Sequence, residues 1–404
     1  MSDGIVIAGG GLAGQRAAET LRRAGYSGAL RMVCAETHLP YDRPPLSKEV
    51  LSGERSEQSL RFRPRSWYSD HGVDLLLGVS AVRLCPAEHL LELSDRSTLR
   101  YDRLLIATGS RPRELPILRG YSNVSALSTL EDALTLRRAL TPGARVTILG
   151  AGFVGLEVAA AARTQGAQVT VIEAGPTPLS RVLGPLGEWF SSLHRSEGVD
   201  VRCETTLTGA SGEDSLSALH FSDGGVLETD HVIVAVGVRP ALDWLSGSGL
   251  PGAGVPVDAY GQSQFDWIYA AGDAAVTFDP ALGRPVPGCH WEAAAAQGAC
   301  AARTMLGIDP GSPPISRFWT DQYGVRIQYV GHAELADGYV ADGDLESREF
   351  EVLFTRAGTA VAALLVGRPR ALPEVLKLIT NGGTRCPTSL KSRKAPARLM
   401  AIAR

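Results

Sequence analysis

The chain has 404 residues, of which 44% are hydrophobic and 21% are charged, and its formal net charge is −3. This length suits two or three globular domains, and the nearly neutral charge gives no electrostatic reason to expect a nucleic-acid partner. No apolar run reaches the roughly 18 residues that a membrane-spanning helix needs. Because a strand starts almost at once, we expect no signal peptide. The six cysteines form no CxxC pair, which favours free thiols in the cytoplasm and no metal site.

The N-terminal stretch predicts a dinucleotide-binding unit. It begins with a strand at Ile5–Ala8, which runs into a GxGxxG turn of Gly9, Gly11 and Gly14. A helix at residues 15–23, a second strand at Leu30–Cys34 and the acid Glu36 follow. In such a turn the first glycine permits the tight bend, the second lets backbone amides approach a pyrophosphate, and the third lets helix and strand pack closely. The small Ala13 also permits a close phosphate approach.

The next segment, YDRPPLSK at 41–48, contains two prolines that exclude a strand or a helix interior. We expect a rigid loop that leads into a short helix, with Ser47 as a candidate cap. Arg43 and Lys48 are candidates to contact phosphate or flavin, while a solvated basic loop is the alternative that the residues alone leave open.

Alternating apolar residues at 79–84 and 89–93 predict a small meander, and 104–106 predict a further strand that ends in a turn at Gly109. A similar strand and turn at 232–240 contains Gly237. The two turns are plausible points at which the chain crosses from one domain to the other. We therefore predict that an NAD module at 110–236 is inserted into an FAD module made of 1–109 and 237–314.

A second fingerprint lies inside the inserted module. A strand at 146–149, the GxGxxG of Gly150, Gly152 and Gly155, a helix at Phe153–Thr164, a strand at 169–172 and the acid Glu173 follow one another. An acid at this offset accepts hydrogen bonds from a ribose 2′-hydroxyl and repels a 2′-phosphate, which favours NADH over NADPH. Two fingerprints call for two dinucleotides, and FAD with NAD(P)H is the pair that makes chemical sense.

Downstream, an apolar strand at 268–271 ends in Gly272-Asp273, where the carboxylate of Asp273 is a candidate to accept a hydrogen bond from the ribityl chain of FAD. An alanine-rich helix at 293–303 follows Trp291, and its N-terminus could face the flavin. From 315 to 404 we expect a third, α+β domain, with strands at 325–330, 348–355 and 360–366 and a helix at 372–379.

These motifs together resemble those of the FAD- and NADH-dependent ferredoxin reductases of bacterial oxygenase systems. That group includes putidaredoxin reductase and the reductases of biphenyl-type dioxygenases, within the glutathione-reductase-like class. The resemblance covers nearly the whole chain, and its carriers are IVIAGGGLAG, YDRPPLSK, LLIATGSRPR, TLEDA, VTILGAGFVGLEVA, IEA, VAVGVRP, YAAGDAA, HWEAAAAQG and FWTDQYG.

The resemblance implies an α/β fold with two Rossmann-like domains and a C-terminal α+β domain. It implies an enzyme, a ferredoxin–NAD(+) reductase. Hydride would pass from NADH to FAD, and electrons would then leave singly to a 2Fe–2S ferredoxin that feeds a monooxygenase or a Rieske-type dioxygenase. The protein would act without nucleic acid or membrane, as a monomer or weak homodimer.

The resemblance also implies residue roles. Lys48, Glu157 and Trp319 would lie at the reacting flavin, with Lys48 near its N5 edge, Glu157 paired to that lysine and facing the nicotinamide, and Trp319 at the exposed edge. The other residues that it implies for FAD are Gly9, Gly11, Ala13, Gly14, Glu36, Arg43, Val82, Gly109, Asp273 and Trp291. The remaining cofactor-binding residues are Gly150, Gly152, Gly155 and Glu173 of the second fingerprint and Gly237 of the second domain crossing.

The sequence departs from the family pattern at three places. Ala35 replaces the first acid of a common pair, Ser128 replaces a frequent FAD-contacting arginine, and Ala241-Leu242 replaces a common asparagine. Two alternatives stay open. A disulfide-active relative needs a thiol over the flavin, but 41–48 holds no cysteine and Cys34 comes too early. A flavin-binding scaffold is the second alternative. A strongly basic surface or a long targeting extension would favour it, and the sequence has neither.

Overall fold

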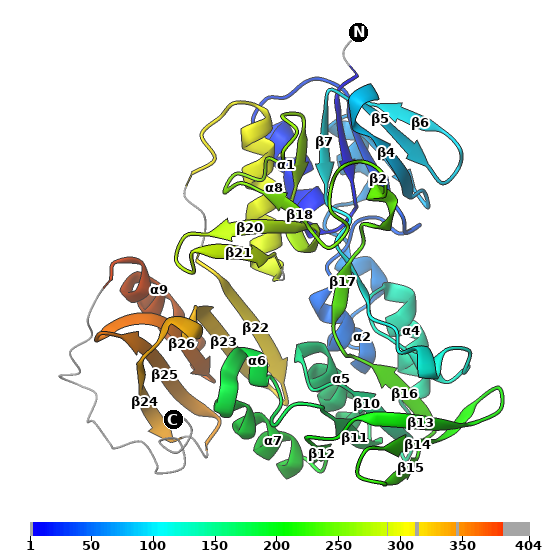
Figure 1. Ribbon diagram of the computed structural model, residues 1–404, viewed down its shortest axis with the longest axis vertical. Helices are drawn as coiled ribbons and strands as arrows, with labels where there is room; N and C mark the ends of the chain where they lie inside the picture. The colour runs from blue at the N-terminus through cyan, green and yellow to red at the C-terminus, as the bar shows by residue number, and fades with distance from the viewer. Residues whose placement is uncertain (1–2, 289, 312–314, 345–346, 383–404) are drawn as a thin grey trace. The chain divides into compact units, whose positions relative to one another are not determined.

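A computed structural model describes residues 3–288, 290–311, 315–344 and 347–382 of the chain (Figure 1). Internal contacts divide the chain into two compact units. The first unit contains Met1–Asp42, Glu57–Arg111 and Val238–Ser316, and the second contains Arg43–Ser56, Pro112–Gly237 and the described part of Arg317–Arg404. The chain first leaves one unit for the other after Asp42, so each unit is built from segments that are far apart in sequence.

The first unit is built on a parallel sheet in the order β19-β7-β1-β2-β3. The strands in that order are Ile268–Ala270, Arg103–Ile106, Ile5–Ala8, Leu30–Cys34 and Val73–Leu77. Their β-branched and leucine residues are buried because a parallel sheet is covered on both faces. The strands predicted at Ile5–Ala8 and Leu30–Cys34 have those bounds in the structure.

The two faces of this sheet have different covers, because side chains alternate along β1. Ile5 and Ile7 share a core with helices α1 (Leu12–Arg23) and α8 (Trp291–Met305), which lie side by side. Val6 and Ala8 share a second core with the antiparallel meander of β4, β5 and β6. The meander strands are Ala81–Cys85, Leu90–Leu93 and Thr98–Arg100. The alternating pattern predicted the first two, at 79–84 and 89–93, but not the third. The first unit also contains α3 (Arg65–Asp70) and a small sheet of β18 (Val255–Val257), β20 (Ala275–Asp279) and β21 (Arg284–Pro287).

The second unit contains a parallel sheet of the same kind, in the order β12-β11-β10-β16-β9. The strands in that order are Asp200–Arg202, Gln168–Ile172, Arg145–Leu149, His231–Val234 and Val124–Ser125. Helix α5 (Phe153–Thr164) connects β10 to β11, as predicted. A meander covers one face through a core that includes Leu219 and Phe221, and its strands β13, β14 and β15 are Leu207–Gly212, Leu216–Phe221 and Val226–Glu228.

An antiparallel sheet forms the rest of the second unit, in the order β22-β23-β26-β25-β24. Its strands in that order are Arg317–Gln322, Val325–Gly331, Thr359–Val366, Glu349–Arg356 and Gly338–Asp344. Helix α9 (Leu372–Thr380) packs on this sheet through Val375. The sequence predicted three of these strands and the helix. It missed β24, and it described 318–323 only as leading into the strands, where the structure has β22. Residues 383–404 of the predicted third domain lie outside the described residues.

Short helices complete the second unit. They are α2 (Glu49–Ser52), α4 (Leu130–Ala139), α6 (Ser180–Leu183) and α7 (Gly187–Ser196). Helix α2 packs on α4 and α5, which is why the segment Arg43–Ser56 groups with the second unit. The predicted α/β fold with an additional α+β portion is confirmed, whereas the predicted domain boundaries stay a prediction. Within the described ranges, no helix has the length and apolar character to cross a membrane.

Candidate functional site

The first glycine turn is shaped by two close backbone approaches and one open position. Gly9 has a φ of +125°, and a Cβ there would lie 2.0 Å from the carbonyl oxygen of Ala107. A Cβ on Gly14 would lie 2.1 Å from the carbonyl oxygen of Gly9. Gly11 caps the start of α1, and a Cβ there would meet nothing within 4 Å. Two glycines are therefore needed for packing, and the third leaves the helix N-terminus open to a ligand.

The second glycine turn repeats this geometry. Gly150 has a φ of +103°, and a Cβ there would lie 2.4 Å from the carbonyl oxygen of Ala235. A Cβ on Gly155 would lie 2.1 Å from the carbonyl oxygen of Gly150, while Gly152 again has open space around it. The open space at Gly11 and Gly152 lets the phosphates of a dinucleotide approach both helix starts, so the residues present suit two such cofactors.

Each module ends its second strand with an acid, and the two acids have different partners. Glu36 follows β2 and accepts a hydrogen bond from the hydroxyl of Tyr41 at 2.5 Å. Glu173 follows β11 and accepts from the backbone amides of Ala151 at 2.8 Å and Gly175 at 2.7 Å. Those amides fix the Glu173 carboxylate beside the glycine turn. A carboxylate has about four lone-pair sites, so Glu173 retains the capacity to accept from a ribose hydroxyl.

A buried ion pair lies in the second unit. Lys48 Nζ donates to Glu157 Oε2 at 2.6 Å, with the lysine side chain 14% exposed and the glutamate 7%. Ser47 also donates a hydrogen bond to Oε2, and Thr320 Oγ1 donates to Oε1 at 2.7 Å. Removing two charges from water is costly, and the pair is tolerated because each carboxylate oxygen has donors. The structure thus brings together two residues that the sequence analysis placed at the reacting flavin.

Ser47 has a different role from the predicted one. It ends a single 3₁₀ turn (Pro44–Ser47), and the N-cap of α2 is Lys48, without a side-chain cap bond. The prediction of Ser47 as a helix cap is therefore wrong. A capping hydroxyl accepts from the backbone N–H groups of a helix, whereas the Ser47 hydroxyl donates to the buried Glu157 carboxylate, which is a strong charged acceptor.

In the first unit, Asp273 lies three residues after the end of β19 and accepts a hydrogen bond from Ser110 Oγ at 2.6 Å. The preceding Gly272 has a φ of +69°, which lets the chain turn there. Trp291 is the first residue of α8, and its indole Nε1 donates to Asp42 Oδ1 at 2.6 Å. These bonds hold both predicted flavin-contacting side chains in place.

The remaining predicted residues lie as follows. Val82 is on β4 and is 47% exposed, and Gly109 follows β7 with a φ of +68°. Gly237 has a φ of +99°. Arg43 donates to the backbone carbonyl of Ser128, the position where relatives were expected to have an arginine.

Trp319 is half-buried on β22, with the Arg326 guanidinium 5.8 Å from its ring centroid. Overall, the first unit holds Gly9, Gly11, Ala13, Gly14, Glu36, Val82, Gly109, Asp273 and Trp291, and the second holds Arg43, Lys48, Gly150, Gly152, Gly155, Glu157, Glu173, Gly237 and Trp319. The cofactor roles of these residues stay predictions.

Sequence reasoning missed the polar residues behind Glu157. Thr320 and Gln322 are buried on one face of β22, and His194 on α7 is fully buried. Burial lowers the pKa of His194 to about 4, although hydrogen bonding to Gln322 acts in the opposite direction. The alternation of Thr320 and Gln322 would have placed them on one face of a strand, but nothing in the sequence pairs them with a histidine more than a hundred residues away.

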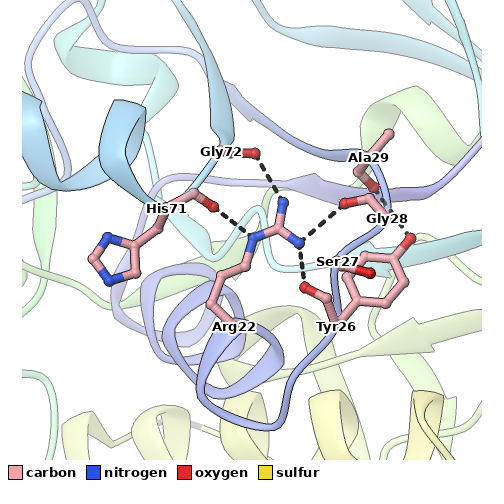
Figure 2. A pocket seen from close by; sticks show the side chains of 7 residues that line it. All are labelled: Arg22, Tyr26, Ser27, Gly28, Ala29, His71 and Gly72. Carbon is pink, nitrogen blue, oxygen red and sulfur yellow. Dashed lines mark hydrogen bonds between the residues drawn. The ribbon is translucent and has the colours of Figure 1, made fainter.

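A pocket in the first unit has a structural role rather than a cofactor role (Figure 2). The Arg22 guanidinium in it donates to the carbonyls of Tyr26, Gly28, His71 and Gly72 at 2.5 to 3.0 Å. Through these four hydrogen bonds the guanidinium joins the loop after α1 to the turn before β3. Arg22 also lies at the opposite end of α1 from the glycine turn, roughly 18 Å away by the helical rise.

Cys34 is the thiol closest in sequence to the predicted flavin loop. It is the last residue of β2 and is 3% exposed. Burial raises the pKa of the Cys34 thiol to about 12, with a smaller contribution from the charge of Glu36. A thiol held protonated in this way is a poor nucleophile and redox group.

Comparisons with known proteins agree with this architecture. The family described as "Pyridine nucleotide-disulphide oxidoreductase" matches residues 3–298, and the one described as "Reductase C-terminal" matches residues 317–401. The chain belongs to the pyridine nucleotide-disulphide oxidoreductase family, and it has the C-terminal domain of its reductases.

Individual relatives match along nearly their whole length. The 5,5'-dehydrodivanillate O-demethylase ferredoxin reductase subunit of a Sphingobium species is 35% identical, over 93% of each chain. Putidaredoxin reductase of Pseudomonas putida is 33% identical, over 94% of this chain and 92% of its own. A crystal structure of the covalent putidaredoxin reductase-putidaredoxin complex matches with a TM-score of 0.92 and 32% identity, covering 99% of this chain and 98% of the other. The resemblance found in the sequence is confirmed.

Proposed function

We propose that this protein is an FAD-containing ferredoxin reductase that takes its electrons from NADH. The observation that carries the proposal is the pair of matched glycine turns, each with an open helix start, together with one buried Lys48–Glu157 pair. The relatives that match over the whole chain include ferredoxin reductase subunits of a demethylase and of dioxygenases, which supports the same activity here.

The residues of the first unit fit FAD, and those of the second glycine turn fit NADH. Together the bound cofactors supply hydride transfer followed by release of single electrons, which is chemistry that side chains do not provide. The chain's own task is positioning and electrostatics. Glu173 orients the adenosine ribose and disfavours a 2′-phosphate by like charge, and Asp273 orients the ribityl chain.

Lys48 places a positive charge in a water-poor environment, where it is worth more than in bulk solvent. Glu157 compensates that charge and fixes its position. In the proposed site the ammonium stabilises negative charge that develops on the flavin, and Glu157 lies toward the nicotinamide. Trp319 provides an aromatic surface at the edge where electrons leave. No side chain acts as a covalent nucleophile.

The acceptor that we propose is a 2Fe–2S ferredoxin that feeds a monooxygenase or a Rieske-type dioxygenase. One relative was solved in a covalent complex with putidaredoxin, and others are components of dioxygenase systems, which supports an electron carrier as the partner. We further propose that the protein acts in the cytoplasm as a monomer or weak homodimer, which sedimentation at micromolar concentration would test.

The direct test is NADH-dependent reduction of cytochrome c with and without a panel of added ferredoxins. We expect the rate to rise at least about tenfold when a matching 2Fe–2S ferredoxin is present, since the enzyme then has its natural outlet. Rates that no ferredoxin changes would refute the proposal. Steady NADH consumption with disulfide substrates would instead point to a disulfide reductase, which the buried Cys34 argues against.

A further inference from the structure

A chain of hydrogen bonds leads from Glu157 into the interior of the second unit. Thr320 Oγ1 lies 2.7 Å from Glu157 Oε1, and Gln322 Nε2 lies 3.1 Å from Thr320 Oγ1. Gln322 Oε1 lies 2.8 Å from His194 Nε2, and the Tyr323 hydroxyl lies 2.9 Å from His194 Nδ1. The four partners come from β22, the turn after it, and α7, so three separate parts of the unit contribute to one continuous chain.

The chemistry of each group gives this chain a single direction. A carboxylate only accepts, so the one proton of the Thr320 hydroxyl points to Glu157, and its lone pairs accept from the Gln322 amide. The Gln322 oxygen must then accept from His194 Nε2–H. A neutral imidazole with its proton on Nε2 has Nδ1 as an acceptor, which receives the Tyr323 O–H. Every donor therefore points toward Glu157, and hydrogen bonds aligned in this way strengthen one another.

Burial makes this arrangement costly to disturb. Thr320 and His194 have no exposed surface, and Gln322 is 1% exposed. A buried polar group without its partner loses the solvation that it had in water, so breaking one link leaves both neighbours unsatisfied. A well-packed apolar core would have filled the same space without that risk.

The backbone at Tyr323 gives independent support. Tyr323 and Gly324 form the two-residue turn between β22 and β23, and their φ values are +51° and +75°. Such turns favour asparagine followed by glycine, because a bulky residue at positive φ is strained. Tyrosine occupies the strained position here, and its hydroxyl and ring both contact His194, with the ring centroids 5.1 Å apart. The strain is offset by the contacts that complete the chain.

We infer that Gln322, His194 and Tyr323 are positioning residues that orient the Glu157 carboxylate through Thr320. With Oε1 held by Thr320, the carboxylate cannot rotate, and Oε2 stays directed at Lys48 and Ser47. The inference rests on the proposed function, in which the Lys48–Glu157 pair serves flavin reduction. It adds that Gln322, Tyr323 and His194, which are not among the predicted cofactor-binding residues, set the geometry of that pair.

The kinetic test compares His194→Leu with His194→Gln in the holoenzyme. Glutamine can donate and accept at about the positions of the two imidazole nitrogens, so it restores the chain, whereas leucine breaks it. We expect His194→Leu to slow flavin bleaching at saturating NADH by about fivefold, as expected for one misplaced hydrogen bond, without changing the NADH concentration for half-maximal rate. His194→Gln should recover most of the rate.

The matched control is Ser191→Ala, which alters a buried residue one turn earlier on α7 and outside the chain. A His194→Leu rate equal to that of Ser191→Ala would overturn the inference. If the wild-type flavin is not bleached by NADH at all, the proposed function fails instead, so the two failures are distinguishable.

A second readout does not depend on turnover. Nitrogen NMR of the histidine side chains should show His194 as the neutral Nε2–H form at pH 7, and Thr320→Val should shift its Nε2 resonance although residue 320 does not touch the imidazole. A proton on Nδ1 in the wild type would reverse the direction of the chain and contradict the inference, as would a His194 resonance unmoved by Thr320→Val.

Discussion

The two glycine-turn modules share their backbone geometry and an open N-cap glycine, but they differ in what packs beside the second residue of the helix. In the first module, α8 packs on α1 so closely that a Cβ on Gly298 would lie 2.1 Å from the carbonyl oxygen of Ala13. The corresponding residue of the second module is Val154, which is 43% exposed. A second helix packed beside the turn suits a cofactor that stays bound, and an exposed side chain at that position suits a cofactor that exchanges in each cycle. The difference supports FAD in the first module and NADH in the second.

The modules also differ two residues after the third glycine. The first has Arg16, which is paired with Glu19 at 2.7 Å, and the second has Glu157, which is paired with Lys48. The same helical position is thus a structural ion pair in one module and the centre of a buried polar network in the other. The fingerprint alone identifies a binding fold, and the residues around it decide its use.

The largest effect that we expect comes from aspartate at the middle glycine of each turn. Gly11→Asp should abolish FAD retention, so the protein purifies without its yellow colour. The Gly152→Asp protein should keep FAD, but its KM for NADH should rise by on the order of 100-fold. A carboxylate at the phosphate-binding turn repels the pyrophosphate of NADH by several kcal/mol. Absorbance spectra and steady-state kinetics measure the two outcomes.

Both variants should fold, so the difference between them reports cofactor binding and not stability. Gly11 and Gly152 have extended backbones and open surroundings, and each is an N-cap, a position that aspartate favours. Gly14→Val, which would collide with the carbonyl of Gly9, is the matched variant that should misfold. Loss of FAD from Gly152→Asp with retention in Gly11→Asp would reverse the assignment of the modules.

The next two predictions concern acid, and each follows one buried group, His194 in the second unit and Glu19 in the first. Burial lowers the pKa of His194 from 6.5 to about 4, so the unfolded state binds the proton first. Its contribution to the free energy of unfolding is complete above pH 6.5 and declines as the pH falls to 4, by about 1.4 kcal/mol per unit and about 3 kcal/mol in all. His194→Asn should therefore show a smaller decrease in thermal midpoint than the wild type between pH 7 and 4.5.

Glu19 on α1 also loses its contribution as the pH falls, but in a lower pH range than His194. Burial raises its pKa, but hydrogen bonds from Arg63, Gln15 and Arg16 outweigh burial and hold the pKa below its ordinary 4.5. Its contribution is present above pH 4.5 and is lost only below that value. Glu19→Gln should thus differ from the wild type by a constant amount from pH 7 to 5. A difference that changes over that range would contradict the assignment.

The smallest effect concerns the acid of the second module. Glu173→Gln removes the negative charge beside the adenosine ribose, and we expect the ratio of kcat/KM for NADPH over NADH to rise about tenfold, or about 1.4 kcal/mol. Glutamine retains an oxygen for one of the two amides that Glu173 now accepts, so the turn should persist. Glu36→Gln in the first module should leave the ratio unchanged, and an equal response of both variants would remove the distinction between the acids.

The local sequence determined most of the fold and the two dinucleotide modules. Helix α5 and strands β1 and β2 have their predicted bounds, because glycine spacing and apolar runs act over a few residues. The Lys48–Glu157 pair was reached only through family resemblance, since its members are 109 residues apart. Ser47 was misjudged because a cap is a local rule, whereas its actual acceptor is a long-range one.

Only the tertiary structure decided what stands behind Glu157. Thr320, Gln322 and Tyr323 lie in the FWTDQYG segment that carries the resemblance, but the sequence assigned none of them a role, and His194 lies outside every recognised motif. A hydrogen bond between residues 128 positions apart, such as that of His194 with Gln322, depends on how α7 and β22 pack. Sequence specifies residue types and local periodicity, but the direction of a buried hydrogen-bond chain is set when packing excludes water and each donor must find its acceptor.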